Sequence, residues 1–178
     1  MTVQWPVIGA CALALTMPAG AATGSACTGS CTSPALRFRP APGWVLLKPG
    51  PSEPSLSRGM VVAVTAADAP ALRPFAPFVG FKRLRPRGML VWATTMGRVA
   101  TSPFPPFPRA AWPPRLAAFR VDHGWEGQPA PDIEQRLRAI AAACWNLDVR
   151  VYFATQHPSR DLLAEAQAQL DRLLLPTC

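Results

Sequence analysis

The chain has 178 residues and a formal net charge of +8, and hydrophobic residues make up 49% of it. That length suits one domain with a leader or a tail, and the apolar content excludes a wholly disordered chain. The charge is uneven: 1–36 carries none, 69–121 carries nine basic and no acidic residues, and 122–178 carries eight acidic and five basic ones. A positive block attracts polyanions, unless the two charged regions neutralise each other within one fold.

The chain begins with an uncharged apolar run at 7–22, VIGACALALTMPAGAA. A membrane span needs about 20 such residues, so this run is short for one and suits the apolar core of a signal peptide. Ala19-Gly20-Ala21 is typical of a cleavage site. We therefore predict a signal peptide at 1–21 and export to the cell envelope or the extracellular space. The alternative is an uncleaved membrane anchor through residues 7–22.

Cleavage would remove Cys11 and leave four cysteines, Cys27, Cys31, Cys144 and Cys178. An even number of cysteines in an exported chain favours disulfides. Zinc is the competing interpretation of the C-x3-C pair at 27–31. No second close pair follows it and histidine is scarce, so we expect no metal and no cofactor.

The first elements read in chain order are a flexible lead-in at 22–43 and three strands. The strands are predicted at 44–48, at 60–65 (MVVAVT) and at 89–95 (MLVWATT), where β-branched and apolar residues run together. The proline-bearing stretch 66–88 excludes a long helix. The six prolines of 99–115 favour an extended segment that wraps the surface.

The next predicted strand is 116–123, LAAFRVDH, which places Phe119, Val121 and His123 on one face. Two interpretations stay open for 132–146: a helical stripe capped by Asp132, or a strand that forms a hairpin with the next run. We favour the hairpin, because 147–155 (LDVRVYFAT) is clearly a strand and needs a neighbour.

The chain then turns and a helix is predicted from Ser159 or Asp161 to about Leu174, with Leu163, Ala166, Leu170 and Leu173 at helical spacing. A strand of about seven residues spans about 23 Å, and a helix of about 14 residues spans about 21 Å. A helix folding back along its strand therefore returns the chain end to the strand's start. This predicts a Cys144–Cys178 disulfide, with Cys27 and Cys31 paired to each other or free.

The segment VRVYFATQHPS followed by LAEAQAQLDRL resembles the C-terminal part of exported bacterial proteins of uncharacterised function. The resemblance covers this one part of the chain. It implies export and a shared fold, and it implies no activity and no functional residue.

Catalytic candidates are few, because the chain has only two histidines, His123 and His157. It has no G-x-S-x-G elbow, no phosphate-binding glycine loop and no H-E-x-x-H motif. Asp122, His123 and Glu126 are the weak candidates for a hydrolytic site, although the strand pattern makes His123 a core residue instead. No nucleic-acid-binding motif is visible.

Together these observations predict an α+β domain at 44–178. It has a mostly antiparallel sheet of about five to seven strands, one C-terminal helix packed on it and a proline-rich surface segment. The favoured function is a non-catalytic exported binding module whose Arg-rich face, Lys82, Arg83, Arg85 and Arg87, attaches to anionic envelope polymers or lipid headgroups. The alternative is an exported hydrolase with a site near Asp122, His123 and Glu126.

Overall fold

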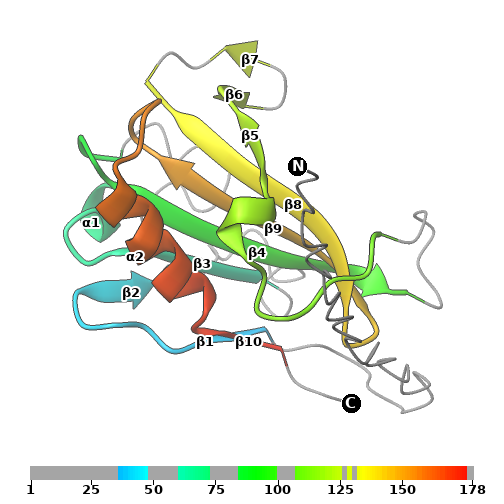
Figure 1. Ribbon diagram of the computed structural model, residues 1–178. Helices are drawn as coiled ribbons and strands as arrows, with labels where there is room; N and C mark the ends of the chain where they lie inside the picture. The colour runs from blue at the N-terminus through cyan, green and yellow to red at the C-terminus, as the bar shows by residue number, and fades with distance from the viewer. Residues whose placement is uncertain are drawn as a thin grey trace, which may run out of the picture.

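The computed structural model describes residues 36–47, 60–72, 84–99, 107–125, 128–129 and 132–175. At its centre is a six-stranded sheet in the order β2–β3–β4–β9–β8–β5, in which every neighbouring pair is antiparallel (Figure 1). The strands are β2 (Trp44–Leu46), β3 (Met60–Thr65), β4 (Met89–Arg98), β9 (Trp145–Phe153), β8 (Glu134–Ala142) and β5 (Arg120–Asp122).

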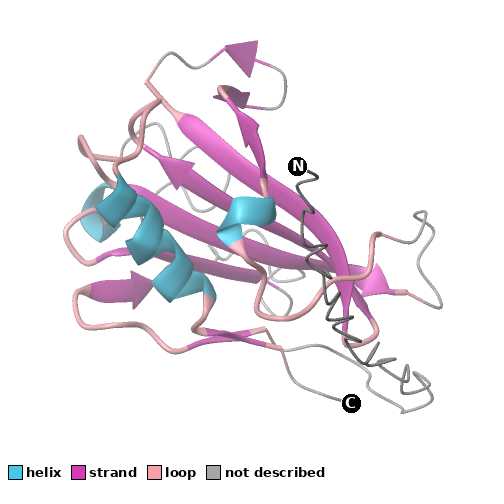
Figure 2. Cartoon of the chain, in the orientation of Figure 1, coloured by secondary structure: helices cyan, strands magenta, loops and turns pink. Residues whose placement is uncertain are grey.

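Smaller elements surround this sheet (Figure 2). The helices are the short α1 (Ala69–Leu72), the 3-10 helix η3 (Leu116–Ala118) and α2 (Arg160–Leu170). Two further strand pairs are β1 (Arg37–Phe38) with β10 (Leu173–Leu174) and β6 (Gly124–Trp125) with β7 (Gln128–Pro129). The predicted α+β class, with a mostly antiparallel sheet and one C-terminal helix, is confirmed.

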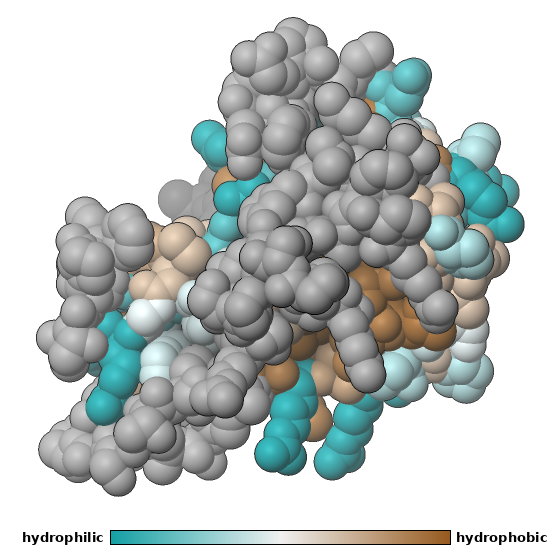
Figure 3. All heavy atoms as spheres, turned by 180° about the vertical axis from the view of Figure 1, so that it is seen from behind, coloured by the Kyte–Doolittle hydropathy of each residue, from teal (hydrophilic) through white to brown (hydrophobic). Residues whose placement is uncertain are grey.

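The central strands are buried on both faces, which is why they read as nearly continuous apolar runs in the sequence. On β9, Leu147, Val149, Val151 and Phe153 point to the face that α2 covers and are fully buried. Tyr152, between two of them, points to the opposite face and joins a second cluster with Val64 and other residues of β3 and β4. Figure 3 views that opposite face, where hydrophobic residues are visible between the grey ones.

Helix α2 begins where the sequence predicts it to begin, because the Ser159 hydroxyl accepts a hydrogen bond from the Leu162 amide at 3.3 Å. Leu162, Ala166 and Leu170 are buried against the sheet. The helix ends four residues before the predicted Leu174, because Leu173 and Leu174 leave it to pair with β1. Tertiary pairing has overridden a helical pattern here.

The open question about 132–146 is answered by β8, which forms a nine-residue hairpin arm against β9. The hairpin interpretation is therefore confirmed and the helical one is wrong. Two residues connect the arms, Ala143 with φ 41° and Cys144 with φ 71°. Both lie in the left-handed region that two-residue hairpin turns need.

The predicted strand 116–123 is wrong over its first half. Leu116–Ala118 forms η3, and only Arg120–Asp122 pairs as an edge strand with β8. Leu116 is held in place under α2, since its amide donates to the Gln167 side chain at 2.7 Å. The predicted inward face is also wrong in part: Phe119 is buried, but Val121, on the edge strand β5, and His123 just after it are exposed.

The predicted flexible lead-in at 22–43 also needs correction at its end. Residues 36–43 belong to the fold, because β1 pairs with β10 and both Leu36 and Phe38 are buried in the main core. The proline-rich segment, where it is described, runs along the edge of β8: the Ala141 amide donates to the Pro108 carbonyl at 2.8 Å. Its Trp112 side chain donates to the Leu173 carbonyl at 3.0 Å.

The predicted signal peptide, and the alternative anchor at 7–22, lie outside the described residues. Within the ranges that the structure describes, no helix has both the length and the apolar character that crossing a membrane requires.

Candidate functional site

The Arg-rich face predicted from the sequence is only half described. Lys82 and Arg83 lie outside the described residues, while Arg85 and Arg87 lie in the turn that enters β4. Arg87 is exposed and has a φ of 65°. Arg85 is exposed over 60% of its side chain, yet its Nε lies 3.0 Å from the Oδ1 of Asp68.

Asp68 is the centre of this turn and is 1% exposed. Its carboxylate accepts hydrogen bonds from the Thr65 hydroxyl at 2.6 Å and from the Arg85 amide at 3.2 Å, besides the Arg85 side chain. A buried carboxylate needs such donors to offset its lost hydration. Arg85 therefore stabilises the turn, and its guanidinium charge is already paired with the Asp68 carboxylate.

Two more arginines of the positive block also face carboxylates. Arg115 lies 3.6 Å from Asp171, and Arg120 lies 3.5 Å from Asp122. Exposed pairs of this kind contribute only about 0–1 kcal/mol to stability. They nevertheless reduce the net field over the block, which supports the interpretation that the two charged regions partly neutralise each other.

The residues suggested for a hydrolytic site are not assembled into one by the described part of the chain. The Asp122 carboxylate is paired with Arg120, and the His123 side chain is exposed. Glu126 lies outside the described residues. Nucleophilic chemistry needs an oriented base within reach of a nucleophile, and no contact of this kind involves His123 in the described ranges.

A cluster that the sequence did not indicate lies on the sheet face away from α2. The Arg150 guanidinium stacks over the Trp92 ring at 4.8 Å and approaches the Asp148 carboxylate to 2.7 Å. Burial acts to lower the pKa of Arg150, but its hydrogen bonds to Asp148 and Tyr152 outweigh this and raise the pKa. Trp92 and Tyr152 are 8% and 1% exposed, so the cluster supports the sheet and offers little surface to a ligand.

A second group of arginines lies on the small β1–β10 ribbon. Just beyond the β1–β10 ladder, the Arg39 amide donates to the Arg172 carbonyl at 3.2 Å, and the Arg172 guanidinium donates from Nη1 to the Arg39 carbonyl at 3.4 Å. Residues opposite each other in an antiparallel ladder point to the same face. Phe38 and Leu173 point into the core, while Arg37 and Arg39 alternate with Phe38 along the chain and are exposed, as is Arg172. We call Arg37, Arg39 and Arg172 the ribbon arginines.

All three ribbon arginines are exposed, and none of them forms an ion pair with a carboxylate in the described part of the chain. The nearest acid in sequence, Asp171, is engaged by Arg115 and by the Gln167 side chain. The Arg172 guanidinium donates to the Arg39 main-chain carbonyl, so the two residues are held together and positive charge gathers at this end of the ribbon.

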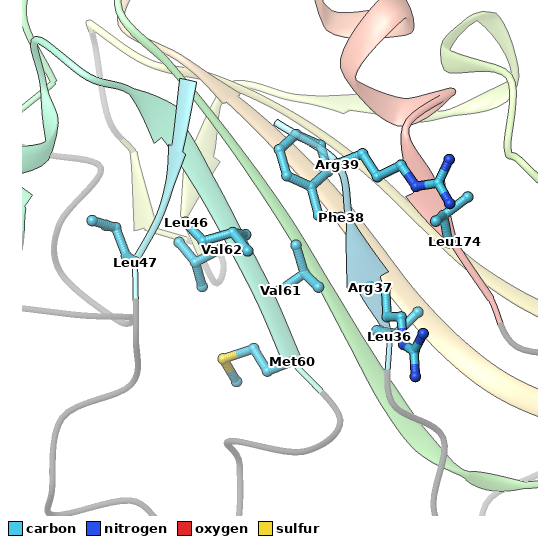
Figure 4. A pocket seen from close by; sticks show the side chains of 10 residues that line it. All are labelled: Leu36, Arg37, Phe38, Arg39, Leu46, Leu47, Met60, Val61, Val62 and Leu174. Atoms are coloured by element: carbon cyan, nitrogen blue, oxygen red, sulfur yellow. The ribbon is translucent and has the colours of Figure 1, made fainter. Parts of the chain in front are cut away.

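A groove of about 460 Å³ lies beside this ribbon, between β1 and the edge of β3 beyond the end of β2 (Figure 4). Apolar side chains dominate it: Leu36, Phe38, Leu46, Leu47, Met60, Val61, Val62 and Leu174. Arg37 and Arg39 also line it, and in Figure 4 the Phe38 ring points toward β3 while the Arg39 side chain extends the other way, toward Leu174. A volume of this size is typical of ligand sites.

The structure leaves the predicted cysteine pairing open. Cys144 is disulfide-bonded, but Cys27, Cys31 and Cys178 lie outside the described residues. The Cys144–Cys178 and Cys27–Cys31 pairs therefore stay predictions. In the described ranges, no three side chains of the His, Cys, Asp and Glu types come together in a way that would hold a metal ion.

No protein-family model, curated protein or solved structure matches the chain. The resemblance of the C-terminal segment to exported bacterial proteins of uncharacterised function therefore remains a prediction.

Proposed function

We propose that this protein is an exported, non-catalytic binding module that attaches to anionic envelope polymers or lipid headgroups. The observation that carries the proposal is the group of three exposed arginines without a carboxylate partner in the described part of the chain: Arg39 and Arg172, which are hydrogen-bonded to each other, and Arg37 beside them. This moves the proposed contact from the 82–87 turn, where Arg85 already braces Asp68, to the ribbon arginines.

The chemistry of the ribbon arginines suits phosphate and carboxylate groups. A guanidinium presents a planar fork of donors that binds both oxygens of such a group and stays charged at every physiological pH. Three guanidinium groups gathered on one small ribbon can share an anionic group, and charge-assisted hydrogen bonds of this kind are stronger than neutral ones.

Export is supported by the apolar run at 7–22 and by the disulfide-bonded state of Cys144. Disulfides persist in oxidising compartments and are rare in the cytosol. An exported protein with an unpaired basic surface meets anionic lipids and wall polymers as its most abundant partners.

The test is co-sedimentation of the purified chain 22–178 with vesicles of phosphatidylglycerol and phosphatidylcholine, compared with vesicles of phosphatidylcholine alone. We expect binding to the anionic vesicles only, and weaker binding as salt is raised from about 0.05 to 0.5 M, because the Debye length falls. The double variant Arg39→Gln/Arg172→Gln is expected to lose most of this binding.

The matched control is Arg109→Gln/Arg160→Gln, which removes the same charge from two exposed arginines elsewhere and should keep most of the binding. A third variant, Lys82→Gln/Arg83→Gln, tests the surface first predicted from the sequence. Equal losses in all three variants would indicate a response to net charge alone and would contradict a defined site. Binding that is insensitive to salt would contradict the proposal as a whole.

A further inference from the structure

We infer that the groove between β1 and the edge of β3 takes the acyl chain of an anionic lipid whose headgroup lies against Arg37 and Arg39. The inference rests on the proposed function and makes it more specific, because a lipid can fill this groove and a wall polymer without an acyl chain cannot. It depends on the side chains that line the groove and on the charges beside it.

The groove contacts both faces of β1. Side chains alternate between the two faces of a strand, and here Leu36 and Phe38 are buried while Arg37 and Arg39 are exposed. All four residues line the groove. Because β10 pairs along one edge of β1, the groove runs along the other edge, which faces β3 (Figure 4). An apolar wall and two guanidinium groups therefore lie one residue apart in a single space.

The opposite wall of the groove is apolar as well. Val61 of β3 and Leu46 of β2 line it, and Leu174 lies at the end toward which the Arg39 side chain extends (Figure 4). Leu46 is 42% exposed, and among the described residues the only other large hydrophobic side chain so exposed is Val121. An acyl chain in the groove would remove the Leu46 side chain from water, which favours binding.

The charges beside the groove have one sign in the part of the chain that the structure describes. Neither Arg37 nor Arg39 forms an ion pair with a carboxylate there. Arg172 adds a third positive charge, since its Nη1 donates to the Arg39 carbonyl at 3.4 Å. Guanidinium groups bind the paired oxygens of a phosphate with their fork of donors. A cationic amphiphile would be repelled, so the charge selects an anionic lipid.

The size of the groove limits how much of a lipid it can hold. Its volume is about 460 Å³, near the lower end of the range of about 300–1,000 Å³ for small-molecule sites. A volume at this end of the range suits one acyl chain rather than two. The matched probe is therefore a lipid with a single chain and an anionic headgroup.

The experiment measures dissociation constants by calorimetry for the chain 22–178 with octanoyl, decanoyl and lauroyl lysophosphatidylglycerol, each below its critical micelle concentration. We expect the affinity to rise about fourfold for each added CH₂ group that the groove buries. Glycerophosphoglycerol has the same headgroup without a chain, and it should bind at least about tenfold more weakly than the lauroyl lipid. Lauroyl lysophosphatidylcholine has the same chain without net charge, and it should also bind about tenfold more weakly.

A labelled lipid locates the chain. Lauroyl lysophosphatidylglycerol with a nitroxide near the end of its chain should broaden the amide resonances of Leu46 and Val61, and it should leave that of Val121 sharp. This measurement uses the unaltered protein, so it does not depend on whether a variant folds.

Two matched variants test the groove wall. Leu46→Asn makes the wall polar and should weaken binding of the lauroyl lipid by about fivefold or more, without changing the binding of glycerophosphoglycerol. Val121→Asn, on an equally exposed side chain of β5 (43%), should leave both affinities unchanged. Unchanged thermal unfolding of the two variants would verify the fold.

An affinity that is independent of chain length, equal losses in the two asparagine variants, or broadening centred on Val121 would each overturn the inference. If glycerophosphoglycerol bound as tightly as the lauroyl lipid, and bound less tightly at high salt, the headgroup contact of the proposed function would stand and the chain site would fail. If lauroyl lysophosphatidylcholine bound as tightly as lauroyl lysophosphatidylglycerol, the ribbon arginines would have no part in binding. That result would contradict the proposed function together with the anionic preference inferred for the groove.

Discussion

The carboxylate of Asp68 and the guanidinium of Arg85 lie 3.0 Å apart, with the acid almost completely buried and the base largely in solvent. The pair joins the end of β3 to the turn before β4, at residues 17 apart in sequence. In the sequence, Arg85 is one of four closely spaced basic residues and has the character of a binding residue. Its contact with Asp68 shows that its side chain fastens the turn instead.

The first prediction concerns this contact. Asp68→Ala removes the acceptor for the Thr65 hydroxyl and for both the main chain and side chain of Arg85. Hydrogen bonds to a charged group contribute about 1.5–3 kcal/mol each when buried, so we expect the free energy of unfolding to fall by about 2–3 kcal/mol. Urea denaturation followed by circular dichroism measures it. Asp132→Ala, at an exposed acid, is the control and should change stability by less than about 0.5 kcal/mol.

The second prediction concerns the β8–β9 turn. Ala143 has a φ of 41° and a side chain exposed to solvent. The left-handed region costs a residue with a Cβ about 1–2 kcal/mol, and asparagine tolerates it better. Ala143→Asn should therefore raise the free energy of unfolding by about 0.5–1 kcal/mol. Ala139→Asn, exposed within β8 itself, should lower it, and equal effects from both substitutions would contradict the turn geometry.

The third prediction concerns the neighbouring Cys144, whose φ is 71° and whose thiol is disulfide-bonded. Glycine would suit the backbone better, so Cys144→Gly should be more stable than the wild type when both are fully reduced. Without reductant the order should reverse, because removing a native disulfide costs about 2–5 kcal/mol. Cys144→Ser separates the two effects, since it loses the bond without relieving the backbone. If the urea midpoint of the wild-type protein were the same with and without reductant, the disulfide would have no structural role.

Local patterns predicted the centre of the fold well, for a physical reason. Strands β3 (60–65, MVVAVT) and β9 are largely buried on both faces, so they appear in the sequence as nearly continuous apolar, β-branched runs that predict strands. The hairpin of β8 was favoured only by the argument that β9 needs a neighbour, since its own sequence also fits a helix. The requirement that β9 pair with a neighbouring strand concerns tertiary structure, and it predicted the β8–β9 hairpin correctly.

The errors lie where distant contacts decide the local structure. Leu116 enters a 3-10 helix because Gln167, far along the chain, holds its amide. Residues 36–38 looked like a loose lead-in because their partner, Leu173–Leu174, was hidden within a helical pattern. The ribbon arginines were missed for the same reason: Arg39 and Arg172 become neighbours only when the two ends of the domain pair. No local signal could have found them.

The fourth prediction concerns export. If the run at 7–22 is a signal peptide cleaved after Ala21, the protein recovered from the culture medium or the cell envelope should begin at Ala22. Intact mass and N-terminal peptide mapping of the unreduced protein measure this directly. The same digest should contain a peptide joining Cys144 to Cys178. A protein that keeps Met1, or a Cys144 peptide joined to Cys27 or Cys31, would contradict the cleavage or the pairing respectively.

The last prediction uses the ribbon arginines to separate stability from binding. Arg39→Glu places a carboxylate next to Arg172, whose guanidinium already contacts the Arg39 main chain, and neighbouring charge pairs of opposite sign contribute about 0.2–1 kcal/mol. We therefore expect the variant to unfold at a slightly higher urea concentration than the wild type, and to lose its retention on phosphatidylglycerol vesicles. If Arg39 had only a structural role, the variant would instead unfold at a lower urea concentration than the wild type and would keep its retention on the vesicles. Arg109→Glu changes the net charge equally, and the residue that Arg109 bridges to is the uncharged Ala141, so it should leave stability unchanged and weaken vesicle binding only slightly. If Arg39→Glu instead destabilised the protein, the side chain of Arg39 would have a structural role, and the proposed headgroup site would lose the observation on which it depends.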